Sequence, residues 1–335
     1  MDTRAFSRPR PRLFRVTISC LTLSALLIAL AFVARVAYAH PAASYTSSTA
    51  YPVVFVHGLS QNNSGLSCGG TWGTAENYLR GSHAINGQNL TWTGTLRTVG
   101  FYYADTACDA YLYEWQSYCT GYFDTPIGNN NESIRHLGCE LAWYIYLNWS
   151  QYGQNVQAVG HSMGGLIVRY ALYGTAHQLG GVFPPYLYMQ DAVSLSAPHG
   201  GVPPYSAVIA CSNCVEGQQM TQGSSFMNEM YNSAQNPQGA GPGTDWTTLG
   251  GKAIWELGCD YVSAGEATYM TQGHKTYYTS PCYGHGGYLT DTNDATDGHV
   301  HYCNGCPTSP SSWSTSNYAP HALHRLFYSL YLSTW

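Results

Sequence analysis

The chain has 335 residues, of which only 9% are charged, against roughly 25% in an ordinary globular protein. It holds 13 Lys and Arg, 18 Asp and Glu and 29 Tyr, and its formal net charge is −5. An acidic chain with so few basic groups lacks the surface that binds a polyanion, which argues against nucleic acid as a partner. Neutral polar side chains and tyrosines must therefore cover much of the surface.

The first 39 residues are typical of a secretory signal peptide. Basic residues precede an apolar block over 16–33, and Ala37 and Ala39 form an Ala-x-Ala cleavage site. We expect cleavage after Ala39 and export. A retained membrane anchor is the alternative, because the apolar block is long enough to span a bilayer.

The remaining residues, 40–335, are within reach of one catalytic α/β domain with loop insertions. Six of the Arg and one of the Asp lie in the leader, so this part carries 7 basic and 17 acidic groups. Its net charge near −10 also argues against an anionic membrane as a partner, and we expect no stable membrane insertion after cleavage.

Ten cysteines remain after the leader, and an even number in an exported chain predicts up to five disulfides. Two pairs have the Cys-x-x-Cys spacing, which suggests zinc or redox chemistry in a cytosolic protein but favours disulfides in an exported one. Which cysteines pair does not follow from the sequence. The ten are Cys68, Cys108, Cys119, Cys139, Cys211, Cys214, Cys259, Cys282, Cys303 and Cys306.

Short apolar runs alternate with segments of helical periodicity along the rest of the chain. The run over 52–56, rich in β-branched residues, predicts a buried parallel strand. Strands that alternate with helices predict an α/β fold with a mainly parallel central sheet and helices on both faces. Further strands are expected at 98–103, 155–160, 189–195, 252–257 and 275–279, helices at 132–149, 165–172 and 319–332, and loops at 236–243 and 307–317.

Ser162 lies in the segment Gly160-His161-Ser162-Met163-Gly164, between an expected strand and an expected helix. A serine hydroxyl becomes a nucleophile when a base lies beside it and a site stabilises the oxyanion that forms. The two glycines permit a sharp turn that presents Oγ above the sheet edge, and the first amides of the following helix point to the same place. We therefore predict that Ser162 is a nucleophile.

Together these segments resemble the secreted bacterial lipases and esterases of the α/β-hydrolase superfamily, over most of the chain from Tyr51 onward. The resemblance implies the α/β-hydrolase fold, a Ser-Asp-His triad in that chain order, and lipid or other acyl esters as substrates. The matching segments are YPVVFVHG (51–58), GHSMGG (160–165), SAPHGG (196–201), GSSFM (223–227), DYVS (260–263) and GHGGYL (284–289).

The resemblance also implies an oxyanion hole made by the backbone N–H groups of Leu59 and Met163. His57, just before Leu59, is interpreted as a turn residue without chemistry. His161 is interpreted as a structural neighbour of Ser162 rather than its base, because adjacent side chains at such a turn point in different directions.

Asp260 is the predicted acid of the triad. It follows the strand expected at 252–257, and Asp260-Tyr261-Val262 resembles the Asp-x-Val segment of the family. Glu266 is the alternative acid. A disulfide through Cys259 would restrain this loop.

His285 is the predicted base, because it lies in a glycine-rich turn after the last parallel strand, where the histidine of the family resides. It would act as general base toward Ser162 and then as general acid toward the leaving alcohol, while Asp260 fixes its tautomer. His321 is the alternative base, since His321 and His324 begin the terminal helix and the histidine loop of simpler members runs directly into such a helix.

A polar segment over 291–306 could bind metal through clustered oxygen ligands for calcium, or through two histidines on one face of a strand for zinc. We interpret it instead as a polar loop insertion held by disulfides, and we expect that the protein requires no cofactor. The residues concerned are Asp291, Asn293, Asp294, Asp297, His299, His301, Cys303 and Cys306.

These patterns predict an exported hydrolase that cleaves carboxylic esters through an acyl-enzyme on Ser162. One alternative is an acyltransferase or a polyester depolymerase with the same triad. Others are a non-catalytic extracellular binding protein on a hydrolase scaffold, argued from the Tyr-rich surface, and a zinc enzyme built on the histidine-rich segment. Acyl chain length and oligomeric state do not follow from the sequence.

Overall fold

The computed structural model describes residues 46–85, 87–121, 126–203, 211, 213–233, 243–251, 260, 273–280, 283–293, 299–304, 314–316 and 320–332. The predicted signal peptide and the strand expected at 252–257 lie outside these residues. So do Glu266, Asp294, Asp297, Cys259, Cys282 and Cys306.

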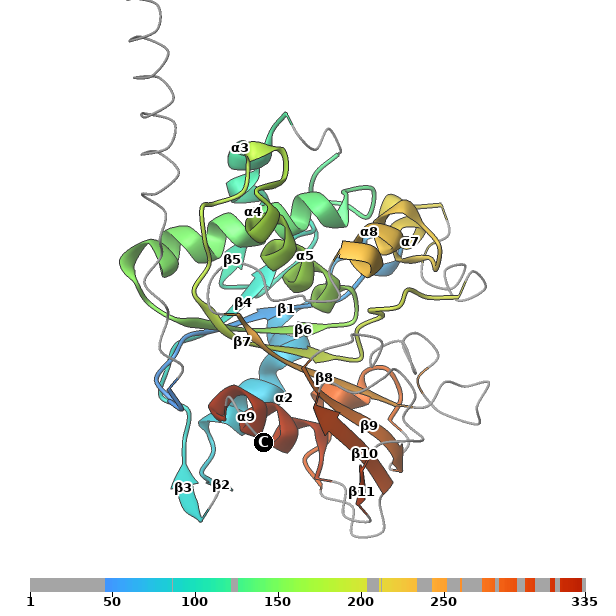
Figure 1. The fold of residues 1–335 in the computed structure, drawn as a ribbon. Coiled ribbons are helices and arrows are strands. Elements are labelled where there is room, and N and C mark those ends of the chain that lie inside the picture. The colour runs from blue at the N-terminus through green and yellow to red at the C-terminus, as the bar shows by residue number, and fades with distance from the viewer. Residues whose placement is uncertain are drawn as a thin grey trace, which may run out of the picture. The chain divides into compact units, whose positions relative to one another are not determined.

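A nine-stranded sheet forms the centre of the fold, in the order β11-β10-β9-β8-β7-β6-β1-β4-β5 (Figure 1). The seven strands from β9 to β5 are parallel, and β10 and β11 continue the sheet antiparallel. A separate hairpin pairs β2 with β3. The strands are β1 (Val53–Val56), β2 (His83–Ile85), β3 (Gln88–Leu90), β4 (Leu96–Gly100), β5 (Ala110–Tyr111), β6 (Val156–His161), β7 (Met189–Leu195), β8 (Asp245–Gly251), β9 (His274–Ser280), β10 (His299–Asn304) and β11 (Ser314–Ser316).

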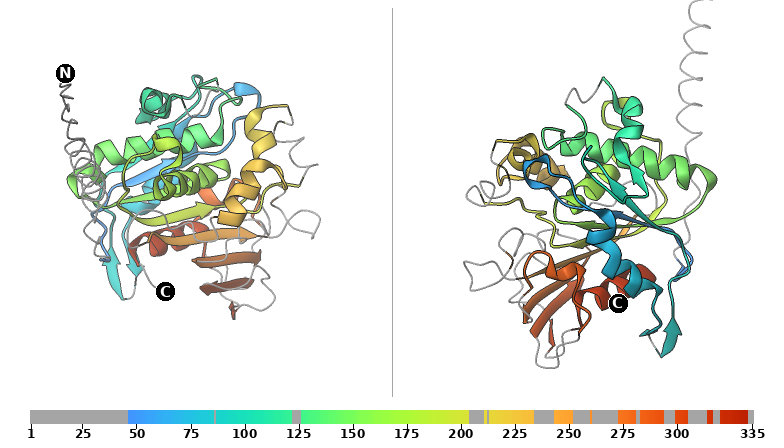
Figure 2. Two further views of the ribbon diagram at one scale, coloured as in Figure 1. Left: turned by 45° about the horizontal axis from the view of Figure 1, so that its top comes forward. Right: turned by 180° about the vertical axis from the view of Figure 1, so that it is seen from behind.

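Helices cover both faces of the sheet, as the alternation of strands and helices predicted (Figures 1 and 2). Successive residues of β1 point to opposite faces. Val54 and Val56 pack in a core with α4 and α5, whereas Val53 and Phe55 pack in a second core with α2 and α9. The helices are α2 (Cys68–Arg80), α3 (Gln116–Cys119), α4 (Ile134–Asn148), α5 (Met163–His177), α7 (Val215–Met220), α8 (Ser225–Ser233) and α9 (Ala322–Tyr331).

The apolar strands were predicted well and the polar ones were not. β7 has the predicted bounds, and β6 is displaced by one residue. β8 was missed because its sequence, DWTTLGG, has threonine and glycine where an apolar run was sought, although the strand is almost wholly buried. β11 lies inside the loop expected at 307–317, because strand pairing with β10 rather than hydrophobicity orders it.

Two disulfides link segments that are separated in the chain, one at the start of α2 and one between α3 and α4. Cys68, the first residue of α2, bonds to Cys108 after β4, and Cys119 at the end of α3 bonds to Cys139 in α4. The sulfurs of Cys211 and Cys214 are also paired. Disulfide-stapled loops were therefore predicted correctly, and tertiary structure decided which cysteines meet.

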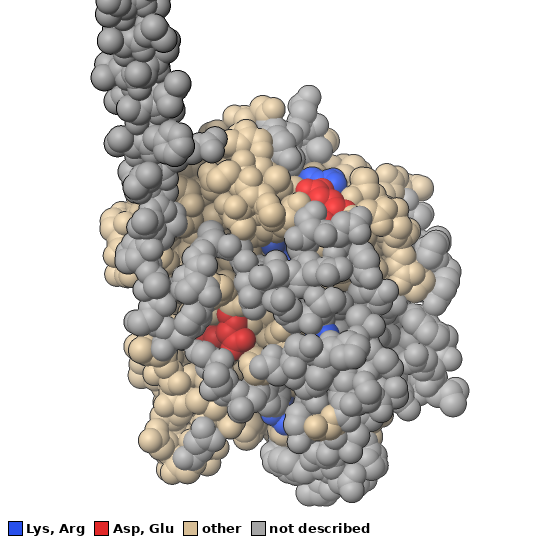
Figure 3. Space-filling model, in the orientation of Figure 1, with Lys and Arg blue, Asp and Glu red and all other residues tan. Residues whose placement is uncertain are grey.

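The described surface is poor in charge, as the composition predicted. On the face drawn in Figure 3, Lys, Arg, Asp and Glu form small spots among other residues. The large hydrophobic side chains exposed in the described part are tyrosines, namely Tyr103, Tyr118 and Tyr152. No helix within the described residues combines the length and apolar character needed to cross a membrane.

Candidate active site

The residues of the candidate site lie at the carboxyl ends of the parallel strands, the edge at which α/β sheets bind ligands. Gly58 follows β1, Ser162 follows β6, Ser196 follows β7 and His285 follows β9 (Figure 1). Because β7, β6 and β1 are adjacent in the sheet and only β8 separates β9 from β7, residues more than 200 positions apart in the chain lie at one edge.

Ser162 occupies a strained turn between β6 and α5. Its φ of 56° and ψ of −130° are unusual for a residue with a side chain, and its N–H donates to Leu195 O at 3.0 Å. The flanking glycines make the turn possible. A Cβ on Gly164 would lie 2.1 Å from Val56 O, and one on Gly160 would lie 2.5 Å from the nitrogen of Gly165.

The loop after β1 lies directly against the Ser162 side chain. A Cβ on Gly58 would come within 2.6 Å of Ser162 Cβ and 3.1 Å of Ser162 Oγ. The peptide between Gly58 and Leu59 is therefore close to the hydroxyl. Met163 is the first residue of α5, and the first amides of a helix have no partner within the helix. Both predicted oxyanion donors thus border Ser162.

Asp260 and His285 meet at the same edge. His285 Nδ1 lies 3.1 Å from Asp260 Oδ1, with the carboxylate buried and the imidazole 18% exposed. Ser196 Oγ hydrogen-bonds to Asp260 Oδ2 and lies 3.2 Å from His285 Nδ1. The predicted acid and base are thus in contact, and a serine with no predicted role touches both.

His161 links the His285 loop to the Ser162 turn. Its Nε2–H donates to the main-chain oxygen of His285 at 2.8 Å, and the two rings lie 4.7 Å apart. Burial, together with the charge of the neighbouring His285, lowers the pKa of His161 to about 3. His161 is therefore neutral at ordinary pH. Hydrogen bonds of a catalytic hydroxyl often tighten only when substrate binds.

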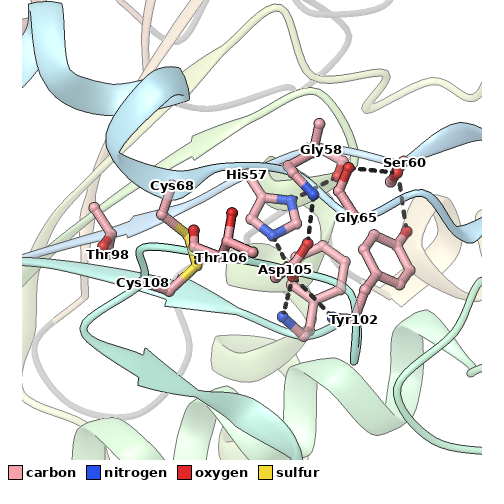
Figure 4. Close-up of polar contacts among 12 residues, drawn as sticks. His57, Gly58, Ser60, Gly65, Cys68, Thr98, Tyr102, Asp105, Thr106 and Cys108 are labelled. Atoms are coloured by element: carbon pink, nitrogen blue, oxygen red, sulfur yellow. Dashed lines mark hydrogen bonds and ion pairs between the residues drawn. A yellow bond between two sulfur atoms is a disulfide. The ribbon is translucent and has the colours of Figure 1, made fainter.

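His57 contacts both the loop that follows β1 and the Asp105 carboxylate (Figure 4). Its Nδ1–H donates to Gly58 O at 2.8 Å, and its Nε2 lies 2.9 Å from Asp105 Oδ2. In a trans peptide the C=O and N–H point in opposite directions. The bond to Gly58 O therefore directs the N–H of Leu59 away from His57. The interpretation of His57 as a turn residue without further role was too simple.

Asp105 receives enough donors to remain ionised although it is buried. Its Oδ2 accepts from the main-chain N–H groups of Phe101 and Tyr102 at 2.8 Å each, and Oδ1 accepts from Leu66 N at 2.7 Å. Burial raises the pKa of Asp105, but the hydrogen bond and charge of His57 with the main-chain donors outweigh burial and hold the pKa below its usual value. Both nitrogens of His57 therefore have partners, Gly58 O at Nδ1 and the Asp105 carboxylate at Nε2.

A second buried acid holds the next part of this loop. Ser60 N donates to the Tyr102 hydroxyl at 3.3 Å, and that hydroxyl donates to Glu216 Oε2 at 2.6 Å. Burial, followed by the charges of Glu132 and Asp105, raises the pKa of Glu216. The loop from His57 to Ser60 is therefore supported from behind at two points.

The alternative base lies in a different environment. His321 is the N-cap of α9, where its Nδ1 accepts from His324 N at 3.1 Å, and its ring packs edge-on against Tyr78 at 4.8 Å. These contacts belong to the α2 and α9 side of the sheet. The structure therefore brings His285, rather than His321, to Asp260.

The described residues contain one cluster of groups that could ligate a metal, and it lies outside the segment 291–306. Glu132, His136 and Glu140 are buried on α4 and just before it, with ligand atoms within 4.8 Å of one another. His136 Nδ1 lies 3.1 Å from Glu132 and Nε2 lies 3.7 Å from Glu140. The two carboxylates lie on opposite nitrogens of the His136 ring. This is the arrangement of two acids that pair with one histidine, rather than of three ligands that surround one metal ion. Burial raises the pKa of both glutamates.

The polar segment over 291–306, for which metal binding was the alternative interpretation, is described only in part. Asp291 Oδ1 accepts from Asn293 N at 3.0 Å, which closes a local turn. His299, His301 and Cys303 lie on β10, where His299 and His301 occupy alternate positions, although a register shift follows His299.

Asp105 and Ser196 are the residues whose importance the sequence reasoning missed. Neither belongs to a motif with an assigned role. Both, however, follow the ends of expected strands, at 98–103 and 189–195, and polar residues in that position of a parallel sheet gather at its ligand-binding edge. Their position just after an expected strand could therefore have predicted that they belong to the site.

The parallel sheet, the helices on both faces and the strained Ser162 turn define an α/β-hydrolase fold. The chain belongs to the class 2 lipase family, since the family model described as Lipase (class 2) matches residues 50–296. None of the curated proteins compared with the chain matched it.

Solved structures similar to this chain include three lipases or phospholipases. The propeptide form of Bacillus licheniformis lipase BlEst2 is 16% identical with a TM-score of 0.42, over 73% of this chain and 48% of that one. Aspergillus fumigatus lipase B is 14% identical with a TM-score of 0.40, over 87% and 63%. Legionella pneumophila phospholipase PlaB is 15% identical with a TM-score of 0.40, over 68% and 47%. The chain thus spans about half the length of BlEst2 and PlaB in these structures.

Proposed function

We propose that the chain is an exported hydrolase of carboxylic esters, including acyl-lipid esters, that works through an acyl-enzyme on Ser162. The observation that carries this proposal is the close approach of Gly58 to Ser162, where a Cβ added to Gly58 would lie 2.6 Å from Ser162 Cβ and 3.1 Å from Ser162 Oγ. It brings an oxyanion loop and a nucleophile turn together at the sheet edge where Asp260 and His285 are hydrogen-bonded.

In the proposed reaction, Ser162 Oγ attacks the ester carbonyl carbon while His285 Nε2 accepts the hydroxyl proton. The N–H groups of Leu59 and Met163 stabilise the resulting oxyanion. The C–O bond to the leaving alcohol then breaks, and His285 returns the proton to that alcohol. Water attacks the acyl-enzyme by the same route, which releases a carboxylic acid and restores Ser162. The reaction as written uses no metal and no other cofactor.

A fluorophosphonate probe tests the nucleophile. We expect the probe to add once to the folded wild type by intact mass, and not to add to Ser162→Ala. His285→Asn should slow the addition by at least about 100-fold. His321→Asn, which keeps an N-cap acceptor for α9, should label like the wild type. Absence of labelling in folded wild type would refute the proposal.

Substrate range is tested with p-nitrophenyl esters of increasing acyl length. Release of p-nitrophenol together with free carboxylic acid supports hydrolysis. Transfer of the acyl group to an added alcohol in preference to water would instead identify an acyltransferase.

We also propose that residues 1–39 are removed on export and that residues 40–335 form one catalytic domain. The small share of charged residues and the disulfides support an extracellular setting. Intact mass of the protein from culture medium should correspond to a chain that begins at His40; a chain that keeps Met1 in the membrane fraction would refute processing.

A further inference from the structure

Ser196, the first residue after β7, contacts both the proposed acid and the proposed base. Its Oγ hydrogen-bonds to Asp260 Oδ2 and lies 3.2 Å from His285 Nδ1, which lies 3.1 Å from Asp260 Oδ1. Ser196 and Asp260 are fully buried. On the basis of the ester hydrolysis proposed above, we propose that Ser196 is a positioning residue that holds Asp260 and fixes the proton of His285 on Nδ1.

The protons of this group can be placed by counting donors and acceptors. An ionised carboxylate only accepts, so the Ser196 hydroxyl donates its single proton to Asp260 Oδ2. The Ser196 oxygen can then only accept from His285, which places a proton on Nδ1. That N–H is shared between Asp260 Oδ1 and Ser196 Oγ. The neutral ring therefore keeps its lone pair on Nε2, the atom that must take the proton of Ser162.

The backbone of Ser196 is held by a hydrogen bond in a strained conformation. Its φ of 55° lies in the left-handed region that favours glycine, and its N–H donates to Leu249 O at 2.7 Å. The preceding residue, Leu195, accepts the N–H of Ser162 at 3.0 Å. The end of β7 thus contacts the nucleophile turn through its main chain and the acid through a side chain. Glycine would relieve the strain, but only a hydroxyl makes the bond to Asp260, and locally unfavourable residues are typical of functional positions.

Three variants separate the hydroxyl from the backbone. Ser196→Ala removes the hydroxyl, and Ser196→Gly removes both the hydroxyl and the strain. Ser194→Ala is the matched control. Ser194 is a buried serine near the end of β7, two residues before Ser196, and its Oγ hydrogen-bonds to His199 Nε2 at 2.9 Å.

We expect Ser196→Ala and Ser196→Gly to lower kcat on p-nitrophenyl esters by about 10-fold or more, with little change in KM, because the ring is less well oriented. The acid limb of the pH–rate profile should move to higher pH by about half a unit to one unit, since a carboxylate without the hydroxyl donor attracts the imidazolium more strongly. Ser194→Ala should keep both kcat and the profile. Wild-type kcat and profile in both Ser196 variants would overturn the inference, and loss in Ser196→Ala but not in Ser196→Gly would assign the effect to the backbone.

A readout without substrate distinguishes this inference from the proposed function. The Nδ1–H of an imidazole bonded to a carboxylate gives a separate low-field proton NMR signal. That signal should shift in Ser196→Ala and stay in place in Ser194→Ala. A shift in an enzyme that hydrolyses no ester would refute the proposed function and leave the hydrogen-bond role of Ser196 intact. An unchanged signal in Ser196→Ala would overturn that role even if the wild type is active.

Discussion

Individual residues at the carboxyl edge of the sheet hold conformations and charges that an isolated peptide would avoid. Ser162 and Ser196 both have positive φ, and His57 and Asp105 are fully buried. Each cost is offset by a specific contact: Leu195 O and Leu249 O accept the two serine amides, and the main chain around Asp105 donates to its carboxylate. Strain and buried charge of this kind persist only where the surrounding structure imposes them.

Asp105→Asn tests whether the buried ion pair supports the oxyanion loop. The substitution removes the carboxylate charge and replaces one accepting oxygen by an N–H₂ group, although both oxygens of Asp105 accept from main-chain N–H groups. We expect kcat on p-nitrophenyl butyrate to fall by about 10- to 100-fold, less than the loss of a whole oxyanion donor, with a smaller change in KM. The free energy of unfolding should fall by about 3 kcal/mol.

Glu114→Gln, at an exposed acid outside this network, is the control for Asp105→Asn and should keep wild-type kcat. An Asp105→Asn enzyme with wild-type kcat would show that the ion pair does not support catalysis.

His161 makes stability depend on pH in a direction that can be worked out. Its pKa of about 3 in the folded chain lies below the value of about 6.5 for an unfolded histidine, so the unfolded state binds the proton more strongly. The resulting stability is present above about pH 6.5 and is lost as the pH falls toward 3. Between pH 7 and pH 5 the loss due to His161 is about 2 kcal/mol.

Urea unfolding of wild type and His161→Gln at pH 7 and pH 5 measures this effect. The Gln side chain can still donate to His285 O but does not titrate. We expect the wild type to lose about 2 kcal/mol more than the variant over this range. Equal losses in the two proteins would contradict the assignment to His161.

At the scale of elements, close approach between backbones decides where glycine is required. β1, β6 and α5 come together at the Ser162 turn, and no side chain fits between Gly164 and the carbonyl of Val56. Parallel strands carry helices on their faces, so the glycines after β6 let α5 pack near the strand ends. Not every helical glycine is so constrained, since a Cβ on Gly73 in α2 would meet nothing within 4 Å.

Gly164→Ala and Gly73→Ala form a matched pair for this point. A Cβ on Gly164 would lie 2.1 Å from Val56 O, whereas one on Gly73 in α2 would meet nothing within 4 Å. We expect Gly164→Ala to destabilise the fold by about 3 kcal/mol or more. Gly73→Ala should stabilise it by about 1 kcal/mol through helix propensity. Urea unfolding checks both, and equal stability of the two variants would contradict the packing assignment.

At the scale of the whole molecule, a sheet of sequentially distant strands is combined with covalent links between helices and loops. The order of the sheet places β1 between β4 and β6, so the chain crosses over repeatedly before the site is complete. Disulfides close two of the intervening segments, with sequence separations of 40 for Cys68–Cys108 and 20 for Cys119–Cys139. Cross-links stabilise a fold chiefly by restricting the unfolded chain.

Cys119→Ser combined with Cys139→Ser tests the shorter link. From loop length alone, the double variant should lose about 3 kcal/mol of unfolding free energy. Reductant at concentrations that cleave only the Cys119–Cys139 bond should lower the thermal midpoint of the wild type and leave that of the double variant unchanged. A double variant as stable as the oxidised wild type would refute a structural role for the link.

The sequence alone determined the α/β class, the strands at 52–56, 155–160 and 189–195, and the turn at Ser162. These features depend on local patterns, namely apolar runs that need a buried strand and glycines that need a tight turn. β8 and β11 were not found, because their residues are polar and only neighbouring strands and buried partners order them.

Tertiary structure decided which side chains meet. Chain order made both His285 and His321 candidates for the base, and only the folded sheet brings His285 to Asp260 while His321 caps α9. Neither Ser196 nor Asp105 had a role assigned from the sequence; they are recognised by their hydrogen bonds to Asp260 and His57. A local pattern specifies the conformation of a segment, whereas contacts between segments depend on strand order and packing, which arise from the whole chain at once.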